Sequence, residues 1–251
     1  MVVVAIVGIL GTTLSPILKS AQTAVGRFKA TQGMVAMGMA SSMYALDHDD
    51  TYMPAMNQRE DGSFETWFGV VDTNRSVTLD GGYITPYLGG ARISDPTAPT
   101  LDYLGDKTGF GYNWQTLGSD FFETGDFAEY PNCLRPAAVT SVGRPGDVLM
   151  FATSAYFHAP WSGGDGKVYD FGFVSPPRDW KGNPDIDFRH NGERKIDVEK
   201  KTVTFDGQAI VLMADLHAKM LKQAEVTDKL YSRGTPDGEV QVTDAIDVDH
   251  F

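Results

Sequence analysis

Residues 1–18 read MVVVAIVGILGTTLSPIL and contain no charged side chain. Twelve of the eighteen are Ala, Val, Ile, Leu or Met, which is the threshold at which an apolar helix can span a bilayer. A secretory signal peptide would begin with basic residues, and a helix buried in a core is unusual at a chain end. We therefore expect lipid, or the same segment of other copies, to cover Val2, Val3, Val4, Ile6, Val7, Ile9, Leu10, Leu14, Ile17 and Leu18.

The helical pattern continues past Lys19 with apolar residues on one side only. One helix ending near Leu46 would be about 70 Å long, with a kink at Gly11 and Pro16. Because one globule cannot cover that length, we divide the chain into an apolar half, residues 1–24, and a globular part, residues 25–251. The face expected to pack under a sheet is formed by Val25, Phe28, Val35, Met39, Ser42 and Leu46, widened by Met34, Met37 and Met43.

The rest of the globular part, residues 51–251, predicts a β-rich body. Gly and Pro recur every eight to twelve residues between short β-prone runs, which is typical of an antiparallel sheet with long loops. Asp206-Gly207 is a hairpin turn signal, and Glu193–Gln208 indicates an inserted hairpin. We expect an α+β fold in which residues 25–46 cover one layer of antiparallel sheet.

Charge and cysteine content exclude several classes of protein. Residues 1–46 carry a charge of +3, and the remaining residues carry 33 acids and 18 bases, which leaves −15 on the body. Such a body repels phosphate backbones, so nucleic acid is not an expected partner. The single cysteine, Cys133, excludes an intramolecular disulfide and a cysteine-rich metal site.

The apolar start followed by a long amphipathic helix resembles type IV pilins and the pseudopilins of type II secretion systems, with Pro16 in the matching place. Residues 43–54 (MYALDHDDTYMP), 109–113 (GFGYN) and 144–150 (RPGDVLM) resemble the large pilin-like proteins with an H-X9-DG closing motif. The closing motif corresponds to His190, Asp215 and His217, with Leu216 where the family has Gly. The resemblance implies a long helix on an antiparallel sheet, a prepilin peptidase, pilus assembly machinery and storage in the inner membrane.

Two clusters of side chains suggest chemistry. Asp47, Asp49 and Asp50 follow the helix and present carboxylates at alternate positions, which suits calcium. A metal-dependent hydrolase would use Asp215, His217 and His190, joined by Asp185 and Asp187. The alternative for both clusters is structural: a solvated acidic turn, and a hydrogen-bonded network. No nucleophile elbow, phosphate-binding loop or zinc-protease motif occurs, so we do not expect an enzyme.

The sequence thus predicts a structural protein, the homopolymeric subunit of a type IV pilus-like filament on the cell surface. The apolar half of the helix would leave the membrane and bundle in the filament core. The alternatives are a pseudopilin that forms a short secretion piston and a membrane-anchored periplasmic hydrolase.

Overall fold

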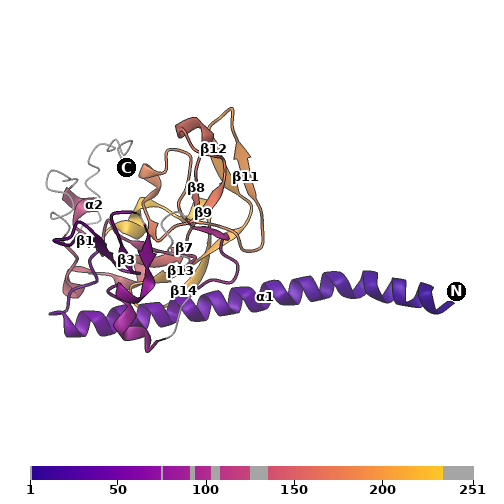
Figure 1. The fold of residues 1–251 in the computed structure, drawn as a ribbon, viewed down its shortest axis with the longest axis horizontal. Helices are drawn as coiled ribbons and strands as arrows, with labels where there is room; N and C mark the ends of the chain where they lie inside the picture. Colours follow the sequence, from indigo (N-terminus) through magenta and orange to yellow (C-terminus); the bar gives the residue numbers. More distant parts are fainter. Residues whose placement is uncertain (1, 75, 91–93, 103–107, 125–134, 234–251) are drawn as a thin grey trace.

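The computed structural model describes residues 2–74, 76–90, 94–102, 108–124 and 135–233. One long helix, α1 (Val2–Asp47), packs its C-terminal half against a β-rich body, and its N-terminal half extends well beyond that body (Figure 1). The predicted α+β architecture is confirmed. Helix α1 is assigned without a break through Gly11 and Pro16, and the kink expected there stays a prediction. Side chains in α1 are described at Ser15 and from Leu18 onward.

A five-stranded sheet in the order β10-β6-β7-β13-β14 forms the centre of the body. Its neighbours are antiparallel except for β10, which runs parallel to β6. Every residue of β6 and β7 is buried, and so are five of the six residues of β13. The strands are β6 (Phe110–Asn113), β7 (Leu149–Thr153), β10 (Phe173–Val174), β13 (Gln208–Met213) and β14 (Ala218–Lys222).

Both faces of this sheet are covered. On one face α1 lies against β7 and β13, where Met34 and Met37 join the cluster that contains Phe151 and Leu212. The opposite face carries a second core, built from strand residues and from later segments of the chain. The prediction of one cover was therefore incomplete, because strand residues with alternating orientation are apolar on both sides here. The second core includes Leu149, Val211, Phe188 and Tyr231.

Smaller sheets and one short helix complete the body. The hairpin expected in residues 193–208 is present as β11 paired with β12. Asp206-Gly207 is not a hairpin turn, because β12 pairs with β11 while β13 pairs with β7 and β14. The elements are β1 (Met56–Gln58), β2 (Phe64–Thr66), β3 (Val70–Val71), β4 (Val77–Thr78), β5 (Leu101–Asp102), β8 (Tyr156–Phe157), β9 (Val168–Asp170), β11 (Arg194–Asp197), β12 (Thr202–Phe205) and α2 (Phe121–Thr124).

The face of α1 that meets the sheet matches the predicted face only in part. Met34 and Met37 are buried as expected, whereas Val25, Phe28, Met39, Met43 and Leu46 are exposed. The contact is made by smaller and more flexible residues, which let the helix approach closely. A Cβ on Gly38 would lie 2.4 Å from Leu212 Cδ2 and 2.8 Å from Leu216 Cδ2, so no larger residue fits there without movement. The buried residues of α1 include Ala30, Met34, Met37, Ala40, Ser41, Tyr44 and Ala45.

Candidate functional site

Helix α1 has a second apolar face, directed away from the body, which we call the outer face. It is formed by Leu18 and by five of the side chains that were expected under the sheet. Phe28 is 64% exposed and Leu46 is 76% exposed, in contrast to Met34 at 0%. Val35, on the same side, is partly buried. The outer face consists of Leu18, Val25, Phe28, Met39, Met43 and Leu46, all more than half exposed.

Helix geometry shows that the outer-face residues lie on one side of α1, where the exposed polar side chain of Gln32 separates Phe28 from Met39. At 3.6 residues per turn, its six residues fall within an arc of about 80°. The residues on the sheet are centred roughly on the opposite side of the helix. A surface helix normally carries polar side chains opposite its buried face. This arrangement is therefore that of a helix with two packing surfaces, of which the body covers one.

The other residues predicted to form the filament core, from Val2 to Ile17, lie where the structure describes the helix but not these side chains. Among the described residues, no helix combines the length and the hydropathy that crossing a membrane requires. Leu18, the last of the predicted set, is 59% exposed. The coverage of these residues by lipid or by other copies stays a prediction.

The acidic residues proposed to bind calcium lie in a tight turn after α1. Asp49 and Asp50 have left-handed backbones, with φ of 52° and 55°, and their side chains are exposed. The Tyr87 hydroxyl hydrogen-bonds to Asp47. Burial raises the pKa of Tyr87, and the hydrogen bond and the negative charge of Asp47 raise it further. Within the described residues, no group of three or more His, Cys, Asp or Glu side chains is placed to hold a metal ion. Calcium stays a prediction.

The charged centre of the body is Arg189, which precedes the first closing-motif residue. Its Nη1 donates to Asp187 Oδ2 at 2.8 Å, and its Nη2 donates to Asp95 Oδ2 at 2.7 Å. The guanidinium also donates to the carbonyl oxygens of Ser154 and Gly109. Burial alone would lower the pKa of Arg189, but the carboxylates of Asp187 and Asp95 raise it overall. All three nitrogens of Arg189 are thus engaged by the protein itself.

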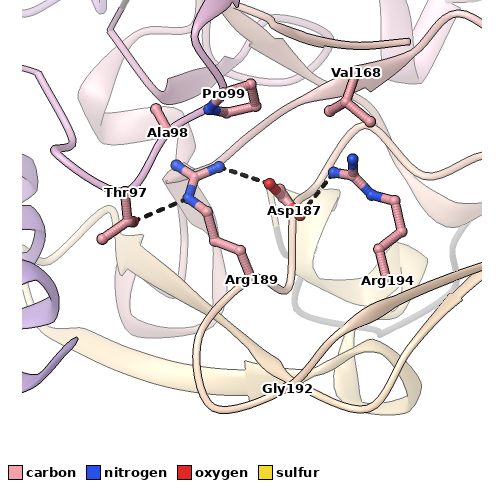
Figure 2. Close-up of a pocket in the computed structure, with 8 residues that line it drawn as sticks. All are labelled: Thr97, Ala98, Pro99, Val168, Asp187, Arg189, Gly192 and Arg194. Atoms are coloured by element: carbon pink, nitrogen blue, oxygen red, sulfur yellow. Dashed lines mark hydrogen bonds and ion pairs between the residues drawn. The ribbon is translucent and has the colours of Figure 1, made fainter. Parts of the chain in front are cut away.

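A shallow cavity of about 320 Å³ lies beside this network, lined by Arg189, Asp187 and Arg194 together with Thr97, Ala98, Pro99, Val168 and Gly192 (Figure 2). Asp187 sits between the two guanidinium groups, because Arg194 Nη2 donates to its Oδ1 at 2.9 Å. With two arginines balanced by Asp187 and Asp95, the wall carries no excess of one charge. We assign this cluster a structural role: it ties the 95–98 loop, β6 and the turn after Phe188 together.

Two buried carboxyl groups strengthen the same region of the body. Asp170 accepts the Gly109 backbone N–H at 2.8 Å, and burial raises the pKa of Asp170 to about 6. Asp185 accepts hydrogen bonds from the Ser175 backbone N–H and from Trp180 Nε1. Burial raises the pKa of Asp185 to about 7. Both groups therefore favour the protonated form in the folded state more than in the unfolded chain.

The residues predicted as a hydrolase site are not brought together. The His190 backbone pairs with Gln208 at the start of β13, whereas Met213 at the end of β13 pairs with His217. Those ends are about 16 Å apart along the strand. His190 is buried, and burial together with Arg189 lowers its pKa. The structure thus separates the two halves of the predicted constellation.

Asp215 and His217 form a pair of their own in the turn between β13 and β14. His217 Nδ1 lies 2.5 Å from Asp215 Oδ1, and both side chains are nearly half exposed. Burial acts to raise the pKa of Asp215, but hydrogen bonds from the His217 backbone and ring lower it overall. Leu216 between them has φ of 71°, a conformation that favours the Gly found in the family pattern. Its side chain instead packs against the core that contains α1.

Sequence reasoning missed the Arg189 network and the true orientation of α1. The Arg-His-Asn-Gly run was noted in the sequence only for its histidine, and it contains no local partner that marks Arg189 as buried. Asp95 lies 94 residues away in sequence, and nothing local indicates the pairing. No protein-family model, no curated protein and no solved structure matches this chain.

Proposed function

We propose that this protein is the structural subunit of an extracellular, type IV pilus-like filament that assembles through α1. Before assembly the N-terminal half of α1 would be held in the inner membrane, and a prepilin peptidase and pilus assembly machinery would act on the chain. The resemblance of the N-terminal stretch and of the closing motif supports this assignment. The observation that carries it is the outer face of α1, which the body leaves uncovered.

The energetics favour assembly by the whole helix and not by the outer face alone. Full burial of a large apolar side chain contributes about 1.5–3 kcal/mol. The five outer-face side chains from Val25 to Leu46, already partly covered in the free subunit, give roughly 4–8 kcal/mol, which is no more than the ~4–15 kcal/mol that association costs. The additional apolar residues before Lys19 are therefore needed to make association favourable. A chain that keeps the outer-face residues from Val25 to Leu46 and lacks residues 1–24 is expected to be a monomer.

The body supports the proposal through its charge. With −15 on residues 47–251, neighbouring bodies repel one another at short range, and salt screens this repulsion beyond about 8–10 Å. Repulsion between bodies disfavours irregular aggregation and leaves the helix as the favourable contact. A repeated contact of that kind between unlike surfaces generates an open helical assembly.

The test compares the full chain with three variants, using negative-stain images and sedimentation. The wild-type chain is expected to give filaments, and removal of residues 1–24 is expected to give monomers. Phe28→Gln with Met39→Gln should abolish filaments without lowering the unfolding temperature of the body. Ile196→Gln with Val198→Gln, which changes two exposed apolar residues of the β11–β12 region, should leave filaments intact.

Filaments that survive the Phe28/Met39 change would refute the role of the outer face. Rods of limited length in the wild type would indicate the pseudopilin alternative, because the same subunit would then build a short piston. A wild-type chain that stays monomeric after release from detergent would refute the proposal as a whole.

A further inference from the structure

The outer face of α1 repeats, along its length, the pattern of the apolar half of the same helix. Eighteen residues make five turns, so positions i and i+18 lie on one line along the helix. For each apolar residue of this side, the residue eighteen positions earlier is also apolar. The pairs are Val7 and Val25, Leu10 and Phe28, Ile17 and Val35, Ala21 and Met39, Val25 and Met43, and Phe28 and Leu46.

One pair of oppositely charged residues in α1 has the same spacing. Lys29 and Asp47 are eighteen residues apart, and both side chains are exposed at the border of the outer face. Lys29 has no ion pair among the described residues, and Asp47 is followed by the exposed carboxylates of Asp49 and Asp50. The end of the outer face nearest the helix exit is therefore acidic, and Lys29 places a basic group about 27 Å earlier along the helix.

We propose that a second copy of this chain docks in parallel on the outer face, displaced by eighteen residues, or about 27 Å, along the helix. This inference rests on the proposed function and adds the register of the contact. Residues 7–28 of one copy lie along residues 25–46 of the other. Lys29 of the first copy then lies level with Asp47 of the second and beside its acidic turn.

Two other displacements that we compared leave Lys29 without an acidic partner. A shift of eleven residues sets Gln32 level with Met43 and Lys29 level with Ala40. A shift of fourteen sets Lys29 level with Met43, which would bury an unpaired ammonium group against an apolar side chain. At eighteen, the five outer-face residues from Val25 to Leu46 each meet an apolar partner, and Gln32 lies level with Leu14. The displacement of eighteen is distinguished from the other two because it sets Lys29 level with Asp47.

The docking geometry leaves room for both bodies. Each body lies on the side of α1 opposite to the outer face, so the second helix approaches from the open side (Figure 1). The contact is heterologous, since one copy uses its N-terminal half and the other its C-terminal half. Each new copy therefore presents a fresh outer face, and growth continues in one direction.

Cysteine cross-linking of the full chain tests the register. In a Cys133→Ser background, Phe28→Cys with Leu46→Cys should give, on oxidation, a ladder of covalent oligomers, because residue 28 of each copy meets residue 46 of the next. A disulfide requires Cα atoms within about 7 Å. The matched control, Phe28→Cys with Met39→Cys, is out of register by seven residues, or about 10 Å, and should give no ladder.

A second experiment tests the charge pair. Lys29→Asp should reduce the assembled fraction several-fold, and adding Asp47→Lys to the same chain should restore it. If filaments form and the control variant gives a ladder, or neither variant gives one, the register is overturned. The proposed function would still stand, because filaments are present. Wild-type protein that forms no assembly in any condition would overturn both.

Discussion

Replacing Arg189 by Met should destabilise the body more than any other single change to a charged residue. The side chain is 10% exposed, and its partner Asp95 is 0% exposed. Removing one member of a buried ion pair costs about 3–5 kcal/mol, because the other charge remains without compensation. Asp187 keeps Arg194 at 2.9 Å, so Asp95 carries most of the loss. The carbonyl groups of Ser154 and Gly109 also lose a donor, which adds up to about 1–3 kcal/mol each where water cannot replace it.

Urea unfolding, followed by tryptophan fluorescence of the full chain in mild detergent, measures this loss. With a slope of about 3 kcal/mol per molar for a body of this size, the midpoint should fall by about 1–2 M. Arg144→Met is the matched control, because Arg144 and Asp147 form a pair that is 73% and 64% exposed and contributes about 0–1 kcal/mol. An Arg189→Met midpoint within about 0.3 M of the control would refute the reasoning. The His190 pKa provides a second readout and should rise, since Arg189 contributes to lowering it.

Three further predictions concern stability. Burial raises the folded-state pKa of Asp185 to about 7 and that of Asp170 to about 6, above the ordinary value of 3.8. At these two groups the folded body binds more protons than the unfolded chain, so its unfolding temperature should fall as the pH rises from 4 to 7. An unfolding temperature that rises over this range would contradict the assignment. Gly38→Ala should cost about 1–3 kcal/mol in urea unfolding, since the new methyl group would overlap Leu212. Leu216→Gly should change the free energy of unfolding by less than about 1.5 kcal/mol, because relief of the positive φ offsets the lost packing. Calorimetry measures this change, and a loss above about 3 kcal/mol would show that no strain is relieved.

The sequence was sufficient for the α+β class, the length of α1 and the inserted hairpin. Each of these depends on local patterns: helical periodicity ends at Leu46, and α1 ends at Asp47. The buried ion network was not accessible in this way. Asp95, Asp187 and Arg189 gain partners only when segments far apart in the chain meet, and their residue types equally suit an exposed surface.

The face of α1 on the sheet was predicted correctly at Met34 and Met37 and wrongly at its largest residues, for a reason specific to this helix. Ranking positions by hydrophobicity selects Phe28, Met39 and Leu46, which are large and exposed. The sheet instead selects residues that permit a close approach, and Gly38 has Leu212 and Leu216 directly above it. Periodicity finds both faces but does not tell which neighbour each one meets. Only the shape of the sheet decides that.

The two faces of α1 also differ in what a mutation would do to the subunit alone. Folding of the body depends on the inner face, so changes at Met34 or Met37 weaken the subunit whether or not it assembles. Within the described residues, Phe28 and Leu46 are mostly exposed, and exposed apolar side chains gathered on one side of a helix favour unwanted association. Polar residues at those positions would leave the body unchanged and lower that hazard. The exposed apolar residues of the outer face therefore support the proposed contact with a second copy, and the negative charge of the body favours a contact made through the helix.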